Sequence, residues 1–261
     1  RLKILFIGDI CGSAGRQIVK DRLPDILGQQ AIELVIANCE NAASGFGITP
    51  RLVEELLACG IDVLTSGNHI WDRKEILDYM AHQPRLLRPA NYPALAPGVG
   101  LYQSQTKAGT EVAVLNLQGR VFMPTIDCPF EAADRELARI PASTKIIVVD
   151  MHGEATSEKQ AMGWYLDGKA TVVIGTHTHV ATADERILPQ GTAYQTDVGM
   201  TGPHDSIIGM RKEGVLQRLR TQLPVRFDPA EGDVRMNALL VEANPATGRA
   251  LSVARLCYRI D

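Results

Sequence analysis

The amino-acid sequence predicts one α/β domain in which parallel and antiparallel strands are mixed. Over residues 1–80, apolar strand-like runs alternate with amphipathic helix-like segments, which is the βαβαβ pattern of a parallel sheet covered by helices. Residues 99–117 have the pattern of an antiparallel hairpin, and residues 185–257 consist mainly of strand-like runs and turns. A chain of 261 residues can bury one large core, and no linker or internal repeat divides it. We therefore expect a single domain over residues 1–261.

Apolar periodicity and capping residues predict the first strands and helices. Apolar side chains recur on one face of residues 14–27, which predicts a helix that Pro24 kinks. The next helix is expected to start with Thr49 as N-cap and Pro50 in its first turn, and to end at Gly60. The strands around these helices are predicted at residues 2–7, 32–37 and 61–65.

Further along the chain, Asp72 is predicted to cap a third helix that ends at about residue 80. Ser157 and Gln160 have the spacing of a capping box, which predicts a helix over residues 158–167. The remaining strands are predicted at residues 99–106, 111–117, 145–150, 171–174, 185–198, 235–243 and 250–257.

Composition excludes several classes of protein. The net charge is −3 with Lys and Arg scattered, so no basic stripe predicts a stable nucleic-acid complex. The five cysteines are widely spaced and form no Cys-x-x-Cys pair, which argues against a zinc ribbon or a disulfide framework. No apolar run approaches the ~20 residues that span a bilayer, and the sequence opens on a strand without a signal peptide. We expect a cytoplasmic protein that does not enter a membrane.

Five short segments that follow predicted strands carry side chains typical of metal ligands. In open α/β sheets, binding sites form beyond the carboxyl ends of the strands. Oxygen and imidazole donors held at fixed positions suit a hard or borderline metal ion. Together the segments offer enough donors for two ions. They are Gly8-Asp9, Asn38-Cys39-Glu40-Asn41, Gly67-Asn68-His69, Met151-His152-Gly153-Glu154 and Gly175-Thr176-His177-Thr178-His179.

Each segment taken alone also has an ordinary structural interpretation. Five such segments together favour a metal site over these separate interpretations. Asp9 alone would be a loop cap, and Glu40 alone a solvated charge. Within the set, Glu40 is predicted to bridge two ions through its two oxygens. An extended backbone would place His177 and His179 on one side, where they bind one ion or two adjacent ions. The alternative is a pair of histidines hydrogen-bonded in a turn.

Asn68 and His69 are adjacent, so their side chains diverge and are not expected to bind the same ion. We predict that Asn68 is a ligand and that His69 is a free imidazole near the substrate. With an ordinary pKa of about 6.5, His69 could donate a proton near neutral pH. The alternative for His69 is a hydrogen bond that orients a ligand.

Three other features are left outside the site. The loop from Gly8 to Gly15 lacks the Gly-x-Gly-x-x-Gly spacing of a dinucleotide loop. Cys11 and Cys39 are expected to be small buried side chains rather than ligands. His204 lies in a loop that could contact a phosphate or form a structural turn.

In their order and strand-end placement, these segments resemble the calcineurin-like metallophosphoesterases over roughly the first 180 residues. The particular residues in these segments resemble those of the bacterial YmdB-like branch of that superfamily, and this resemblance spans essentially the whole chain. The branch-specific segments are Asn38-Cys39-Glu40-Asn41, Gly67-Asn68-His69-Ile70-Trp71-Asp72 and Met200-Thr201-Gly202-Pro203.

The resemblance implies a sandwich of two packed mixed β-sheets flanked by helices, and it implies specific roles. His69 would be the proton donor, and Glu40 would bridge the two metal ions. The first ion would be held by Asp9, Glu40, Asn41 and His179, and the second by Glu40, Asn68, His152 and His177. The branch is associated with iron or manganese and with 2′,3′-cyclic nucleotides.

Two residues depart from the wider superfamily. Cys11 stands where a metal-binding histidine usually follows the first aspartate, and Glu40 replaces the usual bridging aspartate. Asn41 is expected to compensate for the missing histidine. These departures leave the first-site metal and the substrate range open.

The resulting prediction is a metal-dependent phosphodiesterase with two divalent ions per chain, iron or manganese. A metal-bridging hydroxide would attack a small phosphodiester or nucleotide, such as a 2′,3′-cyclic nucleotide, while His69 protonates the leaving oxygen. One alternative is a metal-stabilised regulatory or scaffold protein with residual phosphatase activity. A weaker alternative is a metal-dependent amidohydrolase. Homo-oligomerisation is left open.

Overall fold

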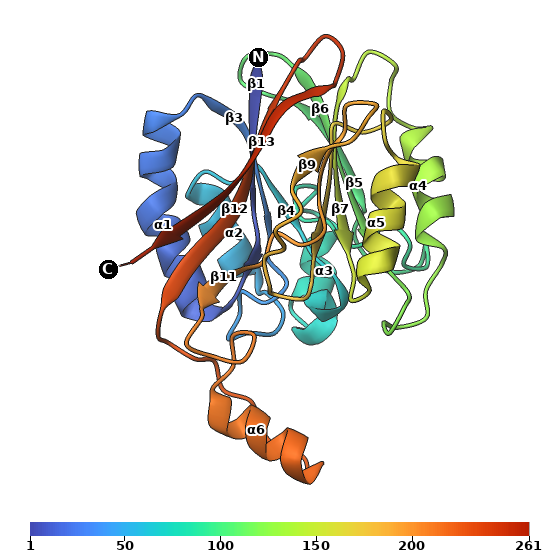
Figure 1. The fold of residues 1–261 in the computed structure, drawn as a ribbon. Helices are drawn as coiled ribbons and strands as arrows, with labels where there is room; N and C mark the ends of the chain where they lie inside the picture. The colour runs from blue at the N-terminus through green and yellow to red at the C-terminus, as the bar shows by residue number, and fades with distance from the viewer. Residues whose placement is uncertain (261) are drawn as a thin grey trace.

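Two mixed β-sheets pack face to face between helices in the computed structural model, which describes residues 1–260 (Figure 1). This arrangement confirms the predicted α/β sandwich. Helices α1 (Gly12–Gln29) and α2 (Pro50–Ala58) lie on the side of one sheet, and α4 (Pro129–Leu137) and α5 (Thr156–Tyr165) lie on the side of the other.

The first sheet contains the N-terminal βαβαβ unit and the C-terminal strands. Among the described residues it has seven strands in the order β2-β11-β12-β1-β3-β4, and β13 also pairs with β12. β1 pairs in parallel with β3, and β3 with β4, whereas β12 is antiparallel to β1. The strands are β1 (Leu2–Ile7), β2 (Asp9–Ile10), β3 (Ile32–Asn38), β4 (Val63–Thr65), β11 (Met200–Pro203), β12 (Val234–Ala243) and β13 (Ala250–Arg259).

The second sheet contains the middle of the chain, with six described strands in the order β5-β6-β7-β8-β10-β9. β6, β7, β8 and β10 are parallel, and the edge strands β5 and β9 are antiparallel to their neighbours. The strands are β5 (Leu101–Gln105), β6 (Glu111–Gln118), β7 (Ile146–His152), β8 (Val172–Thr176), β9 (Arg186–Ile187) and β10 (Ala193–Gln195).

The alternation of side chains along the strands produces three apolar layers. Along β1, Ile4 and Phe6 point into the layer between the sheets, where they meet Val148 of the second sheet. Leu5 and Ile7 point the other way, into the layer under α1 and α2. A third layer lies between the second sheet and α4 and α5. Burial of these three layers fixes the strand register and therefore the positions of the strand ends.

Several predicted elements differ from the structure. Residues after β4 form a 3₁₀ helix, η1 (Asn68–Asp72), and a short helix α3 (Ile76–Met80), so Asp72 does not cap a helix. α5 begins at Thr156 after Ala155, so the predicted capping box is wrong. α4 and α6 (Lys212–Thr221) were not predicted. Residues 185–198, predicted as mainly strand with turns, contain the two short strands β9 and β10.

Polar side chains gather where the parallel strands of both sheets end. β1 starts at the top of Figure 1 and runs downward in this view, and helix α6 projects below the rest of the structure. Asp9, just after β1, pairs with Met200 of β11. Asp9 follows β1, Glu40 follows β3, and His152 ends β7. The shared direction of these strands therefore brings distant parts of the sequence to one edge.

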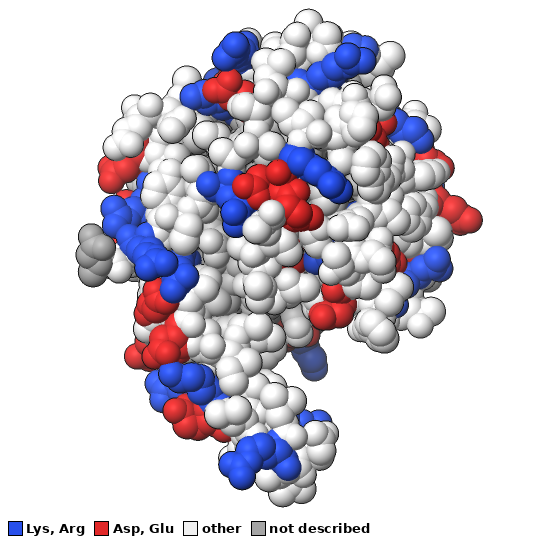
Figure 2. Space-filling model, viewed as in Figure 1, with Lys and Arg blue, Asp and Glu red and all other residues white. Residues whose placement is uncertain are grey.

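Lys and Arg are interspersed with Asp and Glu over the face shown in Figure 2. In the part of the chain that the structure describes, no helix is both long and apolar enough to span a bilayer.

Candidate metal centre

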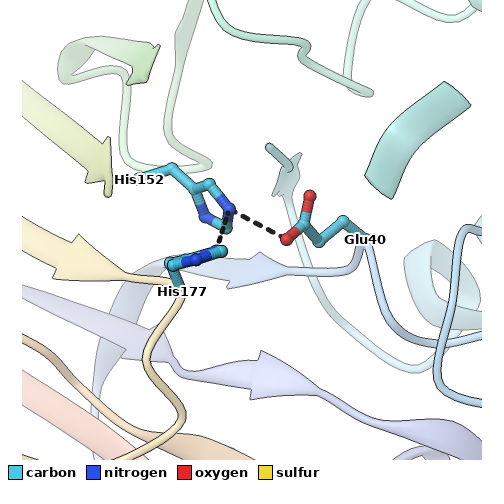
Figure 3. Close-up of side chains that lie close together, drawn as sticks. All are labelled: Glu40, His152 and His177. Carbon is cyan, nitrogen blue, oxygen red and sulfur yellow. Dashed lines mark hydrogen bonds and ion pairs between the residues drawn. The ribbon is translucent and has the colours of Figure 1, made fainter. Parts of the chain in front are cut away.

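Glu40, His152 and His177 form the centre of the site (Figure 3). Each offers one ligand atom within 4.8 Å of the other two. Nε2 of His152 lies 2.9 Å from Oε1 of Glu40 and 3.1 Å from Nδ1 of His177. The amide oxygen of Asn68 is also 3.1 Å from this Nε2. Four predicted ligands from four segments of the chain therefore converge on one point.

A buried chain of hydrogen bonds sets the tautomer of His152. The hydroxyl of Thr176 donates its only proton to Asp150 at 2.8 Å, so its oxygen accepts from Nδ1–H of His152, also at 2.8 Å. Because Nδ1 is engaged by Thr176, Nε2 is the ring nitrogen that faces Glu40 and that a metal ion would bind. This is the arrangement by which metal-binding histidines are usually oriented.

The same proximity couples the titration of His152 and Glu40. Burial by itself lowers the pKa of His152, but the carboxylates of Glu40, Asp9 and Asp150 outweigh burial and raise this pKa to about 9. Burial raises the pKa of Glu40, but the His152 cation outweighs it and lowers this pKa to about 2. With only protein groups around it, His152 therefore carries a proton at neutral pH that a metal ion would have to displace.

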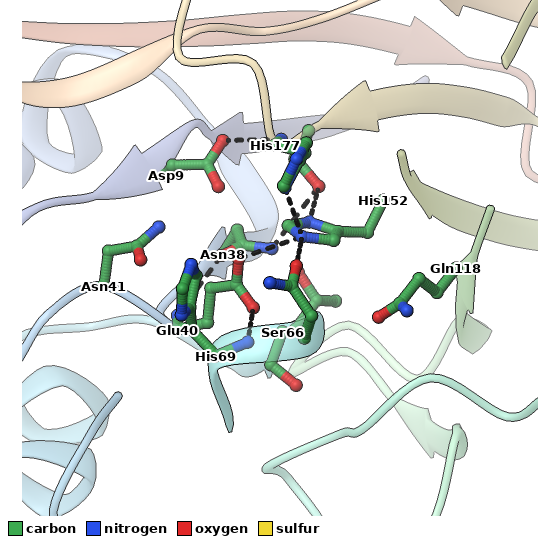
Figure 4. Close-up of polar contacts among 12 residues, drawn as sticks. Asp9, Asn38, Glu40, Asn41, Ser66, His69, Gln118, His152 and His177 are labelled. Atoms are coloured by element: carbon green, nitrogen blue, oxygen red, sulfur yellow. Dashed lines mark hydrogen bonds and ion pairs between the residues drawn. The ribbon is translucent and has the colours of Figure 1, made fainter. Parts of the chain in front are cut away.

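Asp9 and Asn41 lie on the other side of Glu40 from His152 (Figure 4), and His179 lies close to both of them. Nδ1–H of His179 donates to the carbonyl of Ile208 at 2.9 Å, which leaves Nε2 free to bind an ion. That Nε2 lies 3.1 Å from Nδ2 of Asn41 and 4.0 Å from Oδ1 of Asp9. A cation shared with His179 would have to meet the amide oxygen of Asn41 rather than its nitrogen.

The backbone of the two-histidine segment is not extended, so the premise for both imidazoles sharing one side was wrong. His177 has φ 106° and His179 has φ 67°, both in the left-handed region. As a result the rings face different partners: His177 faces His152 and Glu154, and His179 faces Asn41 and Asp9. The segment can therefore serve two neighbouring ions.

A buried ion pair holds this segment in place. Nζ of Lys159 lies 2.8 Å from Asp197 and donates to the carbonyl of Thr176, and both charged side chains are 1% exposed. Asp197 also accepts hydrogen bonds from the backbone N–H and the hydroxyl of Thr178. The pair thus anchors the residues on both sides of His177.

His69 lies beside the centre, and among residues 1–260 its side chain makes no hydrogen bond to the other predicted ligands. Its Nδ1 is 2.8 Å from Oδ2 of Asp72, and its backbone N–H donates to Oε2 of Glu40. The ring packs edge-on against Phe46, with ring centroids 5.2 Å apart. The structure therefore places His69 next to the cluster as expected, with a carboxylate that fixes its orientation.

Two partner residues were missed by sequence reasoning. Asp72 was predicted as a cap, but its side chain contacts His69. The two residues are three positions apart, and residues at this spacing are neighbours in any helical turn. Glu154 lies in one of the predicted segments, yet its contact with Nε2 of His177, at 3.0 Å, had no sequence signal. Both pairs have the geometry of a carboxylate that orients a histidine.

The residues left outside the site remain outside it. Cys11 and Cys39 are fully buried, and burial raises the pKa of both thiols, that of Cys11 to about 12. Neither cysteine belongs to the group of described residues whose ligand atoms converge, which consists of Glu40, His152 and His177. Nδ1 of His204 contacts the carbonyl of Gly202, which is a structural role.

The donor set fits metal ions because buried carboxylate oxygens face imidazole nitrogens at the centre. Oδ1 of Asp9 has no hydrogen-bond donor among residues 1–260, and Oε1 of Glu40 has none besides Nε2 of His152, although both side chains are buried. An unpaired buried carboxylate oxygen is expensive. Burial, followed by the negative charge of Asp197, also raises the pKa of Asp9 well above its ordinary value. A cation between these oxygens and the imidazoles would satisfy both.

The site opens into a cleft of about 380 Å³, a volume typical of small-molecule sites. Its polar end is formed by residues of the centre, including Glu40, His69 and His179, and its other side is apolar. Of the described residues, none that lines the cleft is Lys or Arg. An anionic group bound here would therefore depend on cations at the centre for charge neutralisation.

Comparison with known proteins gives consistent similarities. A family model described as YmdB-like protein matches residues 5–256. A Bacillus subtilis protein named 2′,3′-cyclic-nucleotide 2′-phosphodiesterase is 48% identical over 260 residues, with 100% of this chain and 98% of that protein covered. A structure described as a hypothetical protein from Thermus thermophilus has a TM-score of 0.93 and 41% identity, and 99% of each chain is covered. A structure described as a novel phosphatase of Mycoplasma pneumoniae has a TM-score of 0.92 and 31% identity, with 99% and 93% covered.

Proposed function

Because this chain belongs to the YmdB-like protein family, we propose that it is a phosphodiesterase that hydrolyses 2′,3′-cyclic nucleotides at a paired metal centre. The observation that carries the proposal is that buried carboxylate oxygens of Asp9 and Glu40 face imidazole nitrogens, and that Oδ1 of Asp9 has no hydrogen-bond donor among residues 1–260. Packing alone gives no reason to bury such groups, whereas cation binding does.

In this proposal Glu40 would be a ligand of both ions. Asp9, Asn41 and His179 complete the first site, and Asn68, His152 and His177 complete the second. Iron or manganese suits this mixture of carboxylate, amide and imidazole ligands. When bound, the ions supply charge neutralisation for the phosphate and a lowered pKa for an attacking water.

The chain's own residues orient the ligands and supply the proton. Thr176 and Asp150 hold His152, Glu154 holds His177, and the carbonyl of Ile208 holds His179. These contacts fix the ligand nitrogens before the substrate arrives, which is how a site is preorganised.

His69 is the proposed proton donor to the leaving ribose oxygen. Asp72 holds its Nδ1, so Nε2 is the nitrogen available to a substrate in the cleft. In a cyclic ester the leaving oxygen stays attached to the ribose, so the product is a nucleoside monophosphate. Proton transfer of this kind contributes ~10²–10⁴-fold to turnover.

Three histidine variants test the proposal. His152→Ala should lose both bound metal and hydrolysis of 2′,3′-cyclic AMP, because it removes a central ligand. His69→Ala should retain metal by elemental analysis but lose ~10²–10⁴-fold in kcat on the cyclic nucleotide. The exposed His82 lies outside the cleft, so His82→Ala is the matched control.

Leaving-group dependence separates proton donation from other roles of His69. A p-nitrophenyl phosphodiester releases a good leaving group that needs little protonation, so His69→Ala should affect it much less than the cyclic nucleotide. Equal losses on both substrates would contradict the proton-donor role. Wild-type protein that binds metal but hydrolyses neither substrate would contradict the enzymatic proposal and favour a scaffold role.

A further inference from the structure

Six apolar residues of the cleft form a surface next to the metal centre that the hydrolysis itself does not require. We propose that this apolar wall binds the base of a nucleotide substrate and makes the enzyme selective for phosphodiesters that carry a base. The inference rests on the proposed function, since it places the phosphate at the polar end of the cleft. The apolar wall consists of Phe46, Ile207, Ile208, Met210, Val215 and Phe227.

Ile208 is the residue that most clearly indicates a ligand. Its side chain is 54% exposed, and its φ of 47° lies in the left-handed region. A β-branched residue is strained there, and strain of this kind concentrates at functional sites. Glycine or asparagine would fit this backbone better. What isoleucine supplies is an apolar side chain at the cleft, on the same residue whose carbonyl orients His179.

Contacts of Phe46 and Met210 hold two of the segments that carry the wall. Nε of Arg73 donates to the carbonyl of Phe46 at 3.2 Å, and the same guanidinium donates to the carbonyl of Ala43. A Cβ on Gly45 would lie 2.4 Å from Cε of Met210, so these two segments are in close contact. Met210 in turn bridges to Pro229. A preformed surface loses little entropy when a ligand binds.

A nucleobase matches both the chemistry and the position of this wall. The cleft is continuous from the polar end, where the phosphate would lie, to the apolar wall. A base attached to the same ribose as the phosphate must lie close to it, and a flat apolar base gains by stacking on aromatic and aliphatic side chains. Among the described residues the cleft offers no Lys or Arg, so the wall is unsuited to a second phosphate.

Hydrolysis of matched substrates tests the inference on the metal-loaded protein. The two substrates are 2′,3′-cyclic AMP and the 2,3-cyclic phosphate of methyl riboside, which has the same reacting ring without a base. The readout is the ratio of their kcat/KM values. Ile208→Asn keeps the backbone carbonyl and tolerates the left-handed conformation, while Phe227→Ala removes an aromatic ring from the wall. Ile187→Asn, at a partly exposed isoleucine in β9, is the control.

We expect the ratio to favour the nucleotide in the wild type and to fall about tenfold in Ile208→Asn and in Phe227→Ala, as expected when a base loses a stacking partner. The melting temperature of Ile208→Asn should be unchanged or higher, because backbone strain is relieved. The control should leave the ratio unchanged. A ratio that stays constant in both wall variants overturns the inference, as does a change in oligomeric state without a change in ratio.

The two proposals can fail separately. If the wild type hydrolyses neither ester, the proposed function fails. The dissociation constant of adenosine 3′-monophosphate then decides the base site by itself. A weakening of about tenfold in Ile208→Asn would support the site, and an unchanged constant would overturn it.

Discussion

The buried pair Lys159–Asp197 gives the strongest prediction about how the fold supports the site. Lys159→Met removes one charge of a pair whose side chains are both 1% exposed. Asp197 is then left with a buried charge that only neutral donors contact, namely Thr178 and the backbone N–H of Gly199. Lys159 also loses its hydrogen bond to the carbonyl of Thr176. Both anchors of the segment around His177 are weakened at once.

The magnitude follows from burial. Removing one partner of a buried ion pair costs about 3–5 kcal/mol, because the remaining charge is uncompensated. In a chain of this size, 1 kcal/mol shifts the melting temperature by about 2–4 °C, so the expected decrease is about 6–20 °C. Histidine has no strong local preference for the left-handed backbone conformation of His177, so this conformation depends on the anchors. When they are weakened the ring is held less well, and metal affinity should also fall by about 10–100-fold.

Thermal unfolding and equilibrium metal titration measure the two effects, with the titration performed well below the melting temperature of the variant. Lys212→Met is the matched control, since the Lys212–Asp205 pair is exposed and should not affect either quantity. Adding Asp197→Asn to Lys159→Met removes the unpaired charge while retaining an acceptor for Thr178, so part of the stability should return.

The reasoning would be refuted by a Lys159→Met protein that melts within about 2 °C of the wild type and binds metal equally well. It would also be refuted if the double variant were less stable than Lys159→Met, because the uncompensated charge would then not be the cause of the loss.

Four further predictions follow from contacts within the site. The pKa of His152 is raised to about 9, so a metal ion must displace its proton and apparent metal affinity should rise about tenfold per pH unit from pH 7 to 9. Calorimetry in different buffers should detect the released proton. A metal affinity that does not change with pH contradicts this prediction. The metal-free protein should lose folding stability over about pH 6.5–9, measured by urea unfolding. A histidine whose pKa is raised by folding stabilises the folded state fully below this range, and the contribution is lost as the pH rises through it. Glu154→Ala should weaken metal binding by about 10–100-fold and Glu154→Gln less, since Gln still accepts from His177; equal effects would exclude an orienting role. Gly67→Ala should abolish metal binding because its Cβ would lie 2.0 Å from the ring of His152, whereas Gly28→Ala, with open space around it, should be tolerated in the same titration.

Much of the fold was predictable because its signals are local. The helix that starts at Pro50 has Thr49 as N-cap, and the Thr49 hydroxyl accepts from the backbone N–H of Leu52 as expected. The helix over residues 129–137 and the helix over residues 212–221 gave no clear signal, and the second has no buried residue within the described chain. Apolar periodicity detects a helix by the stripe of side chains that packs on a core. The helix over residues 212–221 projects from the body and has no such stripe, so periodicity does not detect it.

By itself, the sequence determined which residues could form the site, because strand ends in parallel arrangement must meet at one edge of a sheet. Asp9, Glu40 and His152 lie together for that reason, and their roles as ligands stay predictions. Only the tertiary structure decided how the side chains face one another. The left-handed backbone of His177, the contact of Glu154 and the strained Ile208 all depend on partners far away in the sequence. Such contacts leave no periodic pattern in the chain, since packing between distant segments selects the conformation that each residue adopts.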